Sequence, residues 1–298
     1  MKHSLKEWIA VTRYWSFPVS SMPVVATTAY LCSRSMVCPE AIPLAILALL
    51  GVVILHSAGN VLSDWFDYRT GVDNPDAFAV PNLVFGKFQP KEYLVFSIVL
   101  FALGCLIGLL LTALTGWKLL VIGGTGVLLT VAYSFLKYNA LGDLDIFVIF
   151  SVLIIMGTSH VITGAVVPEA LVLALPLGTI TVSVLHANNT FDIESDGRAG
   201  MKSFAMLLGG RRSAGLYRIY MAVPFVCVVA AVIGGLLSPF ALLCLGALVP
   251  AAKNFKAASN FEQKGIRTME GLDQASAKLQ LIFSGLLSAG LFIAALLQ

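Results

Sequence analysis

Two acidic segments with similar polar spacing interrupt a chain that is otherwise mostly apolar. The first reads NVLSDWFDYRTGVD and covers residues 60–73, and the second reads NNTFDIESDGRAGMK and covers residues 188–202. Each segment follows a long apolar run. Because a carboxylate near lipid is energetically costly, clusters of this kind are typical of functional sites.

Within each segment, one amide and two carboxylates recur at intervals of about one helical turn. These residues are Asn60, Asp64 and Asp67 in the first segment, and Asn188, Asp192 and Asp196 in the second. Side chains three or four positions apart share one face of a helix, and like charges so close raise their own pKa values. A divalent cation removes that penalty, and hard oxygen ligands suit Mg²⁺ shared with substrate phosphates. The pattern predicts a divided magnesium site whose four aspartates are catalytic.

Basic residues near the two segments are candidates for binding a diphosphate. They are Arg69, Lys87, Lys137 and Lys202. A substrate with a phosphate head and a hydrocarbon tail, such as an isoprenyl diphosphate, needs a site of this kind at a membrane boundary. Its chemistry requires stabilisation of the departing diphosphate and exclusion of water from the carbocation.

The composition indicates a polytopic membrane protein. Of the 298 residues, 58% are hydrophobic and 12% are charged, whereas soluble domains carry roughly 25% charged residues. A spanning helix needs about 20 largely apolar residues. Nine segments meet this description, and we therefore predict an all-α integral membrane fold. They are 16–33, 41–62, 94–114, 119–136, 143–163, 169–187, 214–236, 238–252 and 279–297.

The placement of basic residues predicts the orientation of these spans. With the N-terminus in the cytoplasm, all of the 19 Lys and Arg residues except Arg34 and Lys118 fall on the cytoplasmic side, as the positive-inside rule requires. Both acidic segments then also face the cytoplasm. We predict a multi-pass protein of the cell membrane with its site on that side. Scattered basic residues do not indicate nucleic acid, and no protein partner is predicted.

The two acidic segments suggest an internal repeat. Asn188 follows Asn60 by 128 positions, an offset that covers four predicted helices. The chain is therefore interpreted as two four-helix units plus one helix, forming one domain over residues 1–298. A repeat related by an axis along the membrane normal would place both acidic segments on the same face of a central cavity.

At these residues the chain resembles the UbiA superfamily of intramembrane prenyltransferases, in particular its branch that acts on 1,4-dihydroxy-2-naphthoate in menaquinone synthesis. The matching stretches are NVLSDWFDYRTGVD, YSFLKYNALGDLDIFVIF and LHANNTFDIESDGRAGMKSFAMLLG. The resemblance covers nearly the whole chain. It implies nine transmembrane helices around a central cavity and Mg²⁺ bound by the two Asp-rich motifs. It also implies that the substrates are a polyprenyl diphosphate and an aromatic acceptor.

The resemblance also implies roles for further residues. Tyr133 and Lys137 match a Tyr-x-x-x-Lys element, and Lys202 matches the lysine after the second motif. Phe191 and Gly197 stand where the branch usually has arginine, with Arg198 following, and the first loop offers only Lys87 where it normally carries arginine. The diphosphate set thus expected is Arg69, Lys87, Tyr133, Lys137, Arg198 and Lys202.

The acceptor contacts are less specific. His186 and Asn189 lie beside the second motif and are candidates for acceptor binding, although a packing role for His186 is an equal alternative. The acceptor could also be 4-hydroxybenzoate, homogentisate or a glycerol phosphate. A cation-coupled transporter is a third interpretation, disfavoured because the acidic residues gather at one face.

Overall fold

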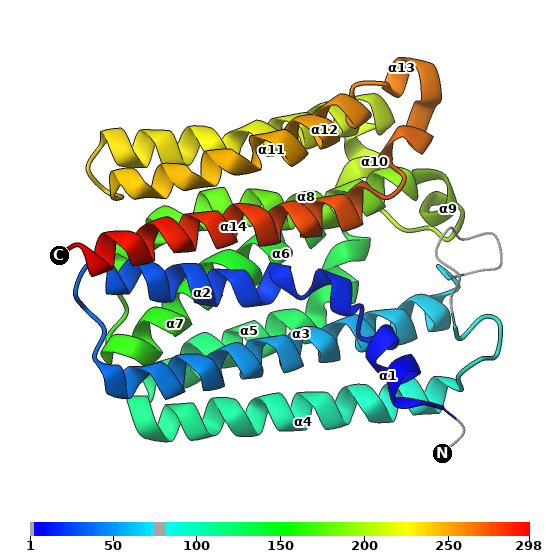
Figure 1. The fold of residues 1–298 in the computed structure, drawn as a ribbon. Helices are drawn as coiled ribbons and strands as arrows, with labels where there is room; N and C mark the ends of the chain where they lie inside the picture. Colours follow the sequence, from blue (N-terminus) through cyan, green and yellow to red (C-terminus); the bar gives the residue numbers. More distant parts are fainter. Residues whose placement is uncertain (1–2, 74–81) are drawn as a thin grey trace.

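The protein is an all-helical bundle whose long helices run roughly side by side (Figure 1). The structure is a computed structural model that describes residues 3–73 and 82–298. Within these ranges it contains no β-strand. The helices of the first half are α1 (Leu5–Val11), η1 (Tyr14–Ser16), α2 (Pro18–Cys32), η2 (Pro39–Ala41), α3 (Ile42–Thr70), α4 (Pro90–Thr115), α5 (Lys118–Tyr138), α6 (Gly142–Phe147), η3 (Val148–Leu153) and α7 (Ile154–Thr163).

The second half of the chain is also entirely helical. It contains η4 (Pro168–Leu173), α8 (Ala174–Phe191), α9 (Ile193–Arg198), α10 (Phe204–Leu208), α11 (Gly210–Ile233), η5 (Pro239–Ala247), α12 (Leu248–Ala258), α13 (Phe261–Lys264), η6 (Gly265–Met269) and α14 (Leu272–Leu296). Several spans consist of two or three consecutive elements, as in η4 with α8. The fold class predicted from the apolar runs is confirmed.

Eight helical segments in the described ranges are long and apolar enough to cross a membrane. They correspond to eight of the nine predicted spans. The remaining one, predicted at 16–33, forms α2, which has only 15 residues. At 1.5 Å per residue, α2 measures about 22 Å, which is shorter than the roughly 30 Å hydrocarbon core. The count of nine spans therefore stays a prediction.

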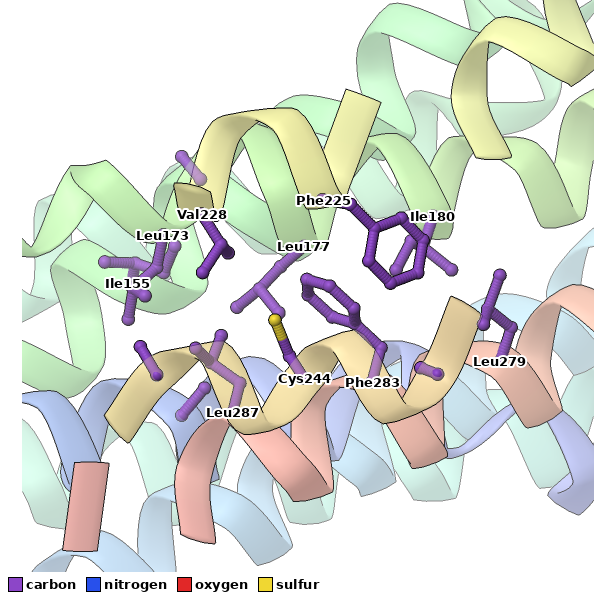
Figure 2. Close-up of a cluster of buried hydrophobic side chains, with 14 of the residues drawn as sticks. Ile155, Leu173, Leu177, Ile180, Phe225, Val228, Cys244, Leu279, Phe283 and Leu287 are labelled. Carbon is purple, nitrogen blue, oxygen red and sulfur yellow. The ribbon is translucent and has the colours of Figure 1, made fainter. Parts of the chain in front are cut away.

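The main apolar core surrounds α8, most of which is buried, whereas α4 and α5 expose most of their surface. Figure 2 shows side chains from α8, α11, η5 and α14 meeting in this core. Phe225 and Phe283 pack edge to face there with ring centroids 5.3 Å apart, a favoured aromatic geometry. The core gives α8, which leads into the second acidic motif, a rigid support.

Small residues allow the helix backbones to approach closely, as is common where helices pack in lipid. A Cβ atom at Gly104 of α4 would lie 2.6 Å from Leu55 of α3. A Cβ atom at Gly290 of α14 would collide with the main-chain carbonyl of Phe240 in η5. These two contacts fix α4 against α3 and η5 against α14.

We therefore expect Gly290→Val to destabilise the bundle by about 1–3 kcal/mol, the usual range for overpacking, because a backbone carbonyl cannot move aside. Apparent melting temperature in detergent measures the effect. Gly285→Val is the matched control, since it lies on the same helix and its Cβ atom would meet nothing within 4 Å. Equal melting temperatures for the two variants would contradict this packing.

Candidate active site

The first acidic motif lies on the last turns of α3. This helix continues to Thr70, eight residues beyond the predicted span, so that Asp64 and Asp67 are helical. Gly71 then ends the helix in the left-handed conformation, with φ 75°. The turn brings Asp73 back, and its main-chain N–H donates to the carbonyl oxygen of Asp67 at 3.1 Å. The first half-site thus contains three aspartates.

Cationic and phenolic groups already contact two of these carboxylates. Lys137 Nζ lies 3.2 Å from Asp67 Oδ2, and the Tyr138 hydroxyl donates to Asp67 Oδ1 at 2.6 Å. The guanidinium of Arg13 forms an ion pair with Asp64. The end of α5 and the segment after α1 therefore both converge on the end of α3.

Arg13 reaches the site through an unusual backbone conformation. Its φ of 55° places it in the left-handed region, which costs energy for a residue other than glycine and persists where surrounding contacts fix it. The neighbouring carbonyl of Thr12 accepts a hydrogen bond from Asn60 Nδ2 at 3.0 Å. The segment between α1 and α2 is thus anchored on the first motif by both a charge and an amide.

The second motif begins in the last turn of α8 and continues beyond it. The main-chain N–H of Asp192 donates to the carbonyl of Asn188 at 2.9 Å, and the short α9 carries Asp196, which is buried. Farther on, the N–H of Lys202 donates to the carbonyl of Tyr138 at 3.2 Å. This contact ties the loop after the second motif to the end of α5, beside the first motif.

Burial and mutual repulsion govern the ionisation of the carboxylates outside the spans. Burial raises the pKa of Asp192 to about 6, with Lys137 opposing the shift and Asp67 adding to it. Burial likewise raises the pKa of Asp196 to about 7, opposed by Lys137 and increased by Asp192 and Asp67. Burial also raises the pKa of Asp73 to about 7, and the negative charges of Asp67 and Asp64 add to this shift. The two motifs therefore interact electrostatically, with Lys137 between them.

A polar pocket of about 130 Å³ opens beside the motifs. Its walls include residues from α3, α5, α8, α14 and the N-terminal segment, among them Arg13, Asn60, Tyr133, Lys137, Asn188 and Asp273. Among the described residues, His, Cys, Asp and Glu form no group of three or more that could hold a metal ion alone. Any cation there would need oxygen ligands from a substrate or from water.

Four residues of the expected diphosphate set are exposed and do not line the polar pocket. The Arg69 guanidinium covers the Trp65 ring, 5.6 Å from its centroid, while Arg198 and Lys202 are exposed. Lys87 pairs with Glu7 of α1 at 3.4 Å. Of the expected set, Tyr133 and Lys137 line the polar pocket.

The candidate acceptor residues have other contacts. His186 is fully buried, its Nδ1 lies 2.7 Å from Asp143 Oδ2, and its Nε2 lies 2.8 Å from Ser213 Oγ. Asn189 is also buried, and neither residue is among the residues that line the polar pocket. These contacts are those expected of the alternative, a packing role for His186 that joins α6, α8 and α11, and acceptor binding by His186 and Asn189 stays a prediction.

Sequence reasoning missed four residues at this site. In the sequence, Arg13 is only one of many basic residues on the predicted cytoplasmic side, and no local pattern marks Asp273. Asp73 ended the first segment without a role, although the glycine two positions earlier could have signalled a turn back. His56 stands within an apolar run of the sequence, lines the pocket and has its Nδ1 3.0 Å from Ser20 Oγ.

Comparison with known sequences supports a single family. Residues 21–264 match the model of the UbiA prenyltransferase family. The UbiA prenyltransferase domain-containing protein 1 of Mus musculus is 32% identical over 231 residues, which cover 75% of this chain and 68% of that protein. Its Drosophila melanogaster homologue is 31% identical over 287 residues, covering 94% of this chain and 77% of that protein.

Solved structures share the same fold. A UbiA homologue from Archaeoglobus fulgidus bound to GPP and Mg²⁺ gives a TM-score of 0.67 at 15% identity, covering 97% of this chain and 99% of that one. An apo UbiA homologue from Aeropyrum pernix K1 gives 0.66 at 19% identity, covering 94% and 98%. Taken with the apolar spans and the paired acidic motifs, these matches show that the chain is an integral membrane protein of the UbiA prenyltransferase family.

Proposed function

We propose that this prenyltransferase moves a polyprenyl group from its diphosphate to an aromatic acceptor, with 1,4-dihydroxy-2-naphthoate as the leading candidate. The observation that carries the proposal is that Asn60 of the first motif and Asn188 of the second line one pocket with Lys137, whose Nζ lies 3.2 Å from Asp67 Oδ2. Two acidic half-sites that interact across one lysine suit a single multiply charged ligand. The resemblance of both motif stretches to the naphthoate branch selects the acceptor.

The carboxylates fit a magnesium-diphosphate ligand. Mg²⁺ commonly takes one or two carboxylates and completes its shell with water and substrate phosphates, so a preformed cluster of three acids is not needed. Asp64 and Asp67 would hold it from the first motif, Asp192 and Asp196 from the second, oriented by Asn60 and Asn188. When bound, Mg²⁺ would stabilise the negative charge on the leaving diphosphate.

The chain's own cations bind and orient the diphosphate. Arg13 and Lys137, now paired with Asp64 and Asp67, would exchange these partners for phosphate oxygens once the carboxylates are neutralised. The Tyr133 hydroxyl in the pocket wall would donate a hydrogen bond to the diphosphate. The exposed basic residues would attract the anion toward the pocket; they are Arg69, Lys87, Arg198 and Lys202. Arg13 would thereby supply a guanidinium near positions where the branch pattern has lost arginines, at Phe191 and Gly197.

The electron-rich ring of the acceptor then attacks the allylic carbon. The new carbon–carbon bond takes its electron pair from the ring, and the breaking carbon–oxygen bond leaves its pair on the diphosphate. For the naphthoate, loss of the carboxylate as carbon dioxide restores aromaticity. Apolar pocket walls from Ile149, Phe150 and Val184 keep water from the carbocation.

Other acceptors fit the same site, and a panel with one donor distinguishes them. The panel contains 4-hydroxybenzoate, homogentisate, a glycerol phosphate and the naphthoate. A prenylated product from one of the first three, without product from the naphthoate, would reassign the acceptor and leave the reaction class intact. Cation transport into proteoliposomes without prenyl transfer would instead favour a transporter.

Purified protein should form prenylated product from a prenyl diphosphate, the acceptor and Mg²⁺, and both Asp64→Ala and Asp192→Ala should abolish it, because each removes an oxygen ligand of the shared metal site. Glu40→Ala is the control, since Glu40 is an exposed carboxylate in η2 outside both motifs. Turnover retained in both aspartate variants would reject the metal-site assignment.

Arg13→Gln should raise the KM for the donor about 10-fold to 100-fold, as expected for a lost charge-assisted hydrogen bond worth roughly 1.5–3 kcal/mol. Inhibition by inorganic diphosphate should weaken in parallel. Arg211→Gln removes only an exposed ion pair with Glu262. It should leave the KM for the donor and the inhibition by inorganic diphosphate unchanged. An unaltered KM in Arg13→Gln would exclude the residue from diphosphate binding.

The raised pKa values of Asp73, Asp192 and Asp196 predict a pH dependence with a defined sign. In metal-free protein the folded state keeps protons that the unfolded state loses near its ordinary pKa of about 3.9. Stability should therefore fall as pH rises from about 4 to about 7. Mg²⁺ competes with these protons, so it should raise the melting temperature more at about pH 8 than at about pH 5.

Melting curves in detergent, with a chelator or with Mg²⁺, test this sign. The variant Asp192→Asn with Asp196→Asn should show a flatter pH profile in chelator and little stabilisation by Mg²⁺. An equal Mg²⁺ effect at both pH values in the unaltered protein would mean that these carboxylates do not bind the metal.

A further inference from the structure

A second and larger cavity adjoins the polar pocket. It has a volume of about 470 Å³ and lies between α3, α4, α5 and the η3–α7 segment. Its lining is overwhelmingly apolar. Four residues, His56, Thr130, Ile149 and Phe150, line both this cavity and the polar pocket. The two spaces therefore adjoin at these four residues, one with many polar side chains in its wall and the other almost entirely apolar.

The inward face of α5 forms one wall of this cavity. Leu119, Gly123, Gly126 and Thr130 follow helical spacing and share that face. Leu119 is buried, and a Cβ atom at Gly59 of α3 would lie 2.7 Å from Thr130 Cγ2. Gly123 lies between these two packed positions, yet its Cβ atom would meet nothing within 4 Å. The space in front of Gly123 is the cavity itself.

Gly51 and Gly104, which also line the cavity, serve close packing instead, whereas Gly108 and Gly124 meet nothing within 4 Å. A Cβ atom at Gly51 would lie 3.0 Å from Ile107, and one at Gly104 would lie 2.6 Å from Leu55. Beyond Gly123, at the end of the α5 wall farthest from Thr130, the cavity is bordered by a buried cluster. This cluster includes Leu111, Leu119 and Val161. Gly123 therefore does not bring two helices together but leaves room for something else.

We infer that Gly123, by leaving this cavity open as far as Leu119, determines how many isoprene units of the donor's tail fit. The inference rests on the proposed function, because it takes the diphosphate to lie beside the acidic motifs. A polar head in the pocket would place the following hydrocarbon against Ile149 and Phe150, at the entrance of the apolar cavity. An isoprenoid tail is the apolar part of that same molecule.

The length of the cavity indicates the length of the tail. Its α5 wall runs from Leu119 to Thr130, which at 1.5 Å per residue is about 16 Å. A peptide residue spans up to about 3.6 Å with three backbone bonds, so an isoprene unit with four bonds spans about 4.5–5 Å. The cavity thus holds about three units. With the reacting unit in the polar pocket, the preferred donor carries about four.

The cavity also reaches the lipid-facing surface. Leu109 of α4 and Leu120 and Leu128 of α5 line it, although each side chain is more than half exposed. The tail enters between α4 and α5 through this opening. A tail longer than the cavity can extend into lipid through the same opening, so the longest donor that reacts does not measure the cavity. The decisive test therefore shortens the cavity by mutation.

The test is Gly123→Leu, assayed with donors of one, two and four isoprene units. The new side chain would fill the cavity about 10 Å from Thr130, which leaves room for roughly two units. The ratio of kcat/KM for the four-unit donor to that for the two-unit donor should fall about tenfold or more, since even one methylene in an apolar pocket is worth roughly that much. The one-unit donor should react as before, which also shows that the variant is folded.

Two further variants complete the series. Gly123→Ala should give an intermediate ratio, and it replaces the leucine variant if that protein does not accumulate. Gly285→Leu makes the same change on α14, at a position with open space that does not line the cavity, and it should leave the ratio unchanged.

The outcomes separate the inference from the function on which it rests. If the unaltered protein converts no donor with any acceptor, the proposed function fails. If it converts them and the Gly123 variants keep its ratio, or shift it no more than Gly285→Leu does, the tail lies elsewhere and the inference is overturned.

Discussion

The need to neutralise several carboxylates at the edge of an apolar bundle is the constraint on which the site depends. Asp64, Asp67, Asp192 and Asp196 come from two distant parts of the chain, and burial disfavours the charged form of Asp192 and Asp196. In the metal-free protein, Arg13 and Lys137 supply part of the compensation. A magnesium-diphosphate ligand would supply the rest, so that the same repulsion that weakens the empty site favours the loaded one.

The fold provides this arrangement with a rigid and an adaptable side. The core around α8, with Phe225 and Phe283 packed against it, fixes the helix that leads into the second motif. The segment between α1 and α2 makes polar contacts with α3, the Arg13 ion pair and the Asn60 amide, while Trp8 and Val11 of α1 pack in an apolar cluster. Donor binding would exchange those polar contacts without disturbing the apolar core. Beside the pocket, the cavity along α5 is lined by apolar side chains, whereas the pocket itself contains charged ones.

The sequence predicted the fold class, eight of the spans and the two acidic motifs, because apolar runs and regular aspartate spacing are local signals. It could not predict Arg13, whose contact with Asp64 spans 51 positions and depends on a left-handed residue. Asp73 depends on a turn at Gly71, and Asp273 on how α14 packs. The position of His186 beside the second motif is visible in the sequence, whereas its contacts with Asp143 and Ser213 depend on how α8 packs. Local spacing reveals which residues can do chemistry, whereas packing decides which of them share a cavity.

The central claim, that both motifs bind one ligand, is tested most directly by a double-mutant cycle on metal binding. Mn²⁺ affinity in the presence of inorganic diphosphate would be measured by electron paramagnetic resonance for Asp67→Asn, Asp196→Asn and the double variant. A shared site predicts that each single change weakens binding strongly and that the double variant loses much less than the sum of the two free-energy changes. Fully additive losses would show two independent sites and would contradict the account.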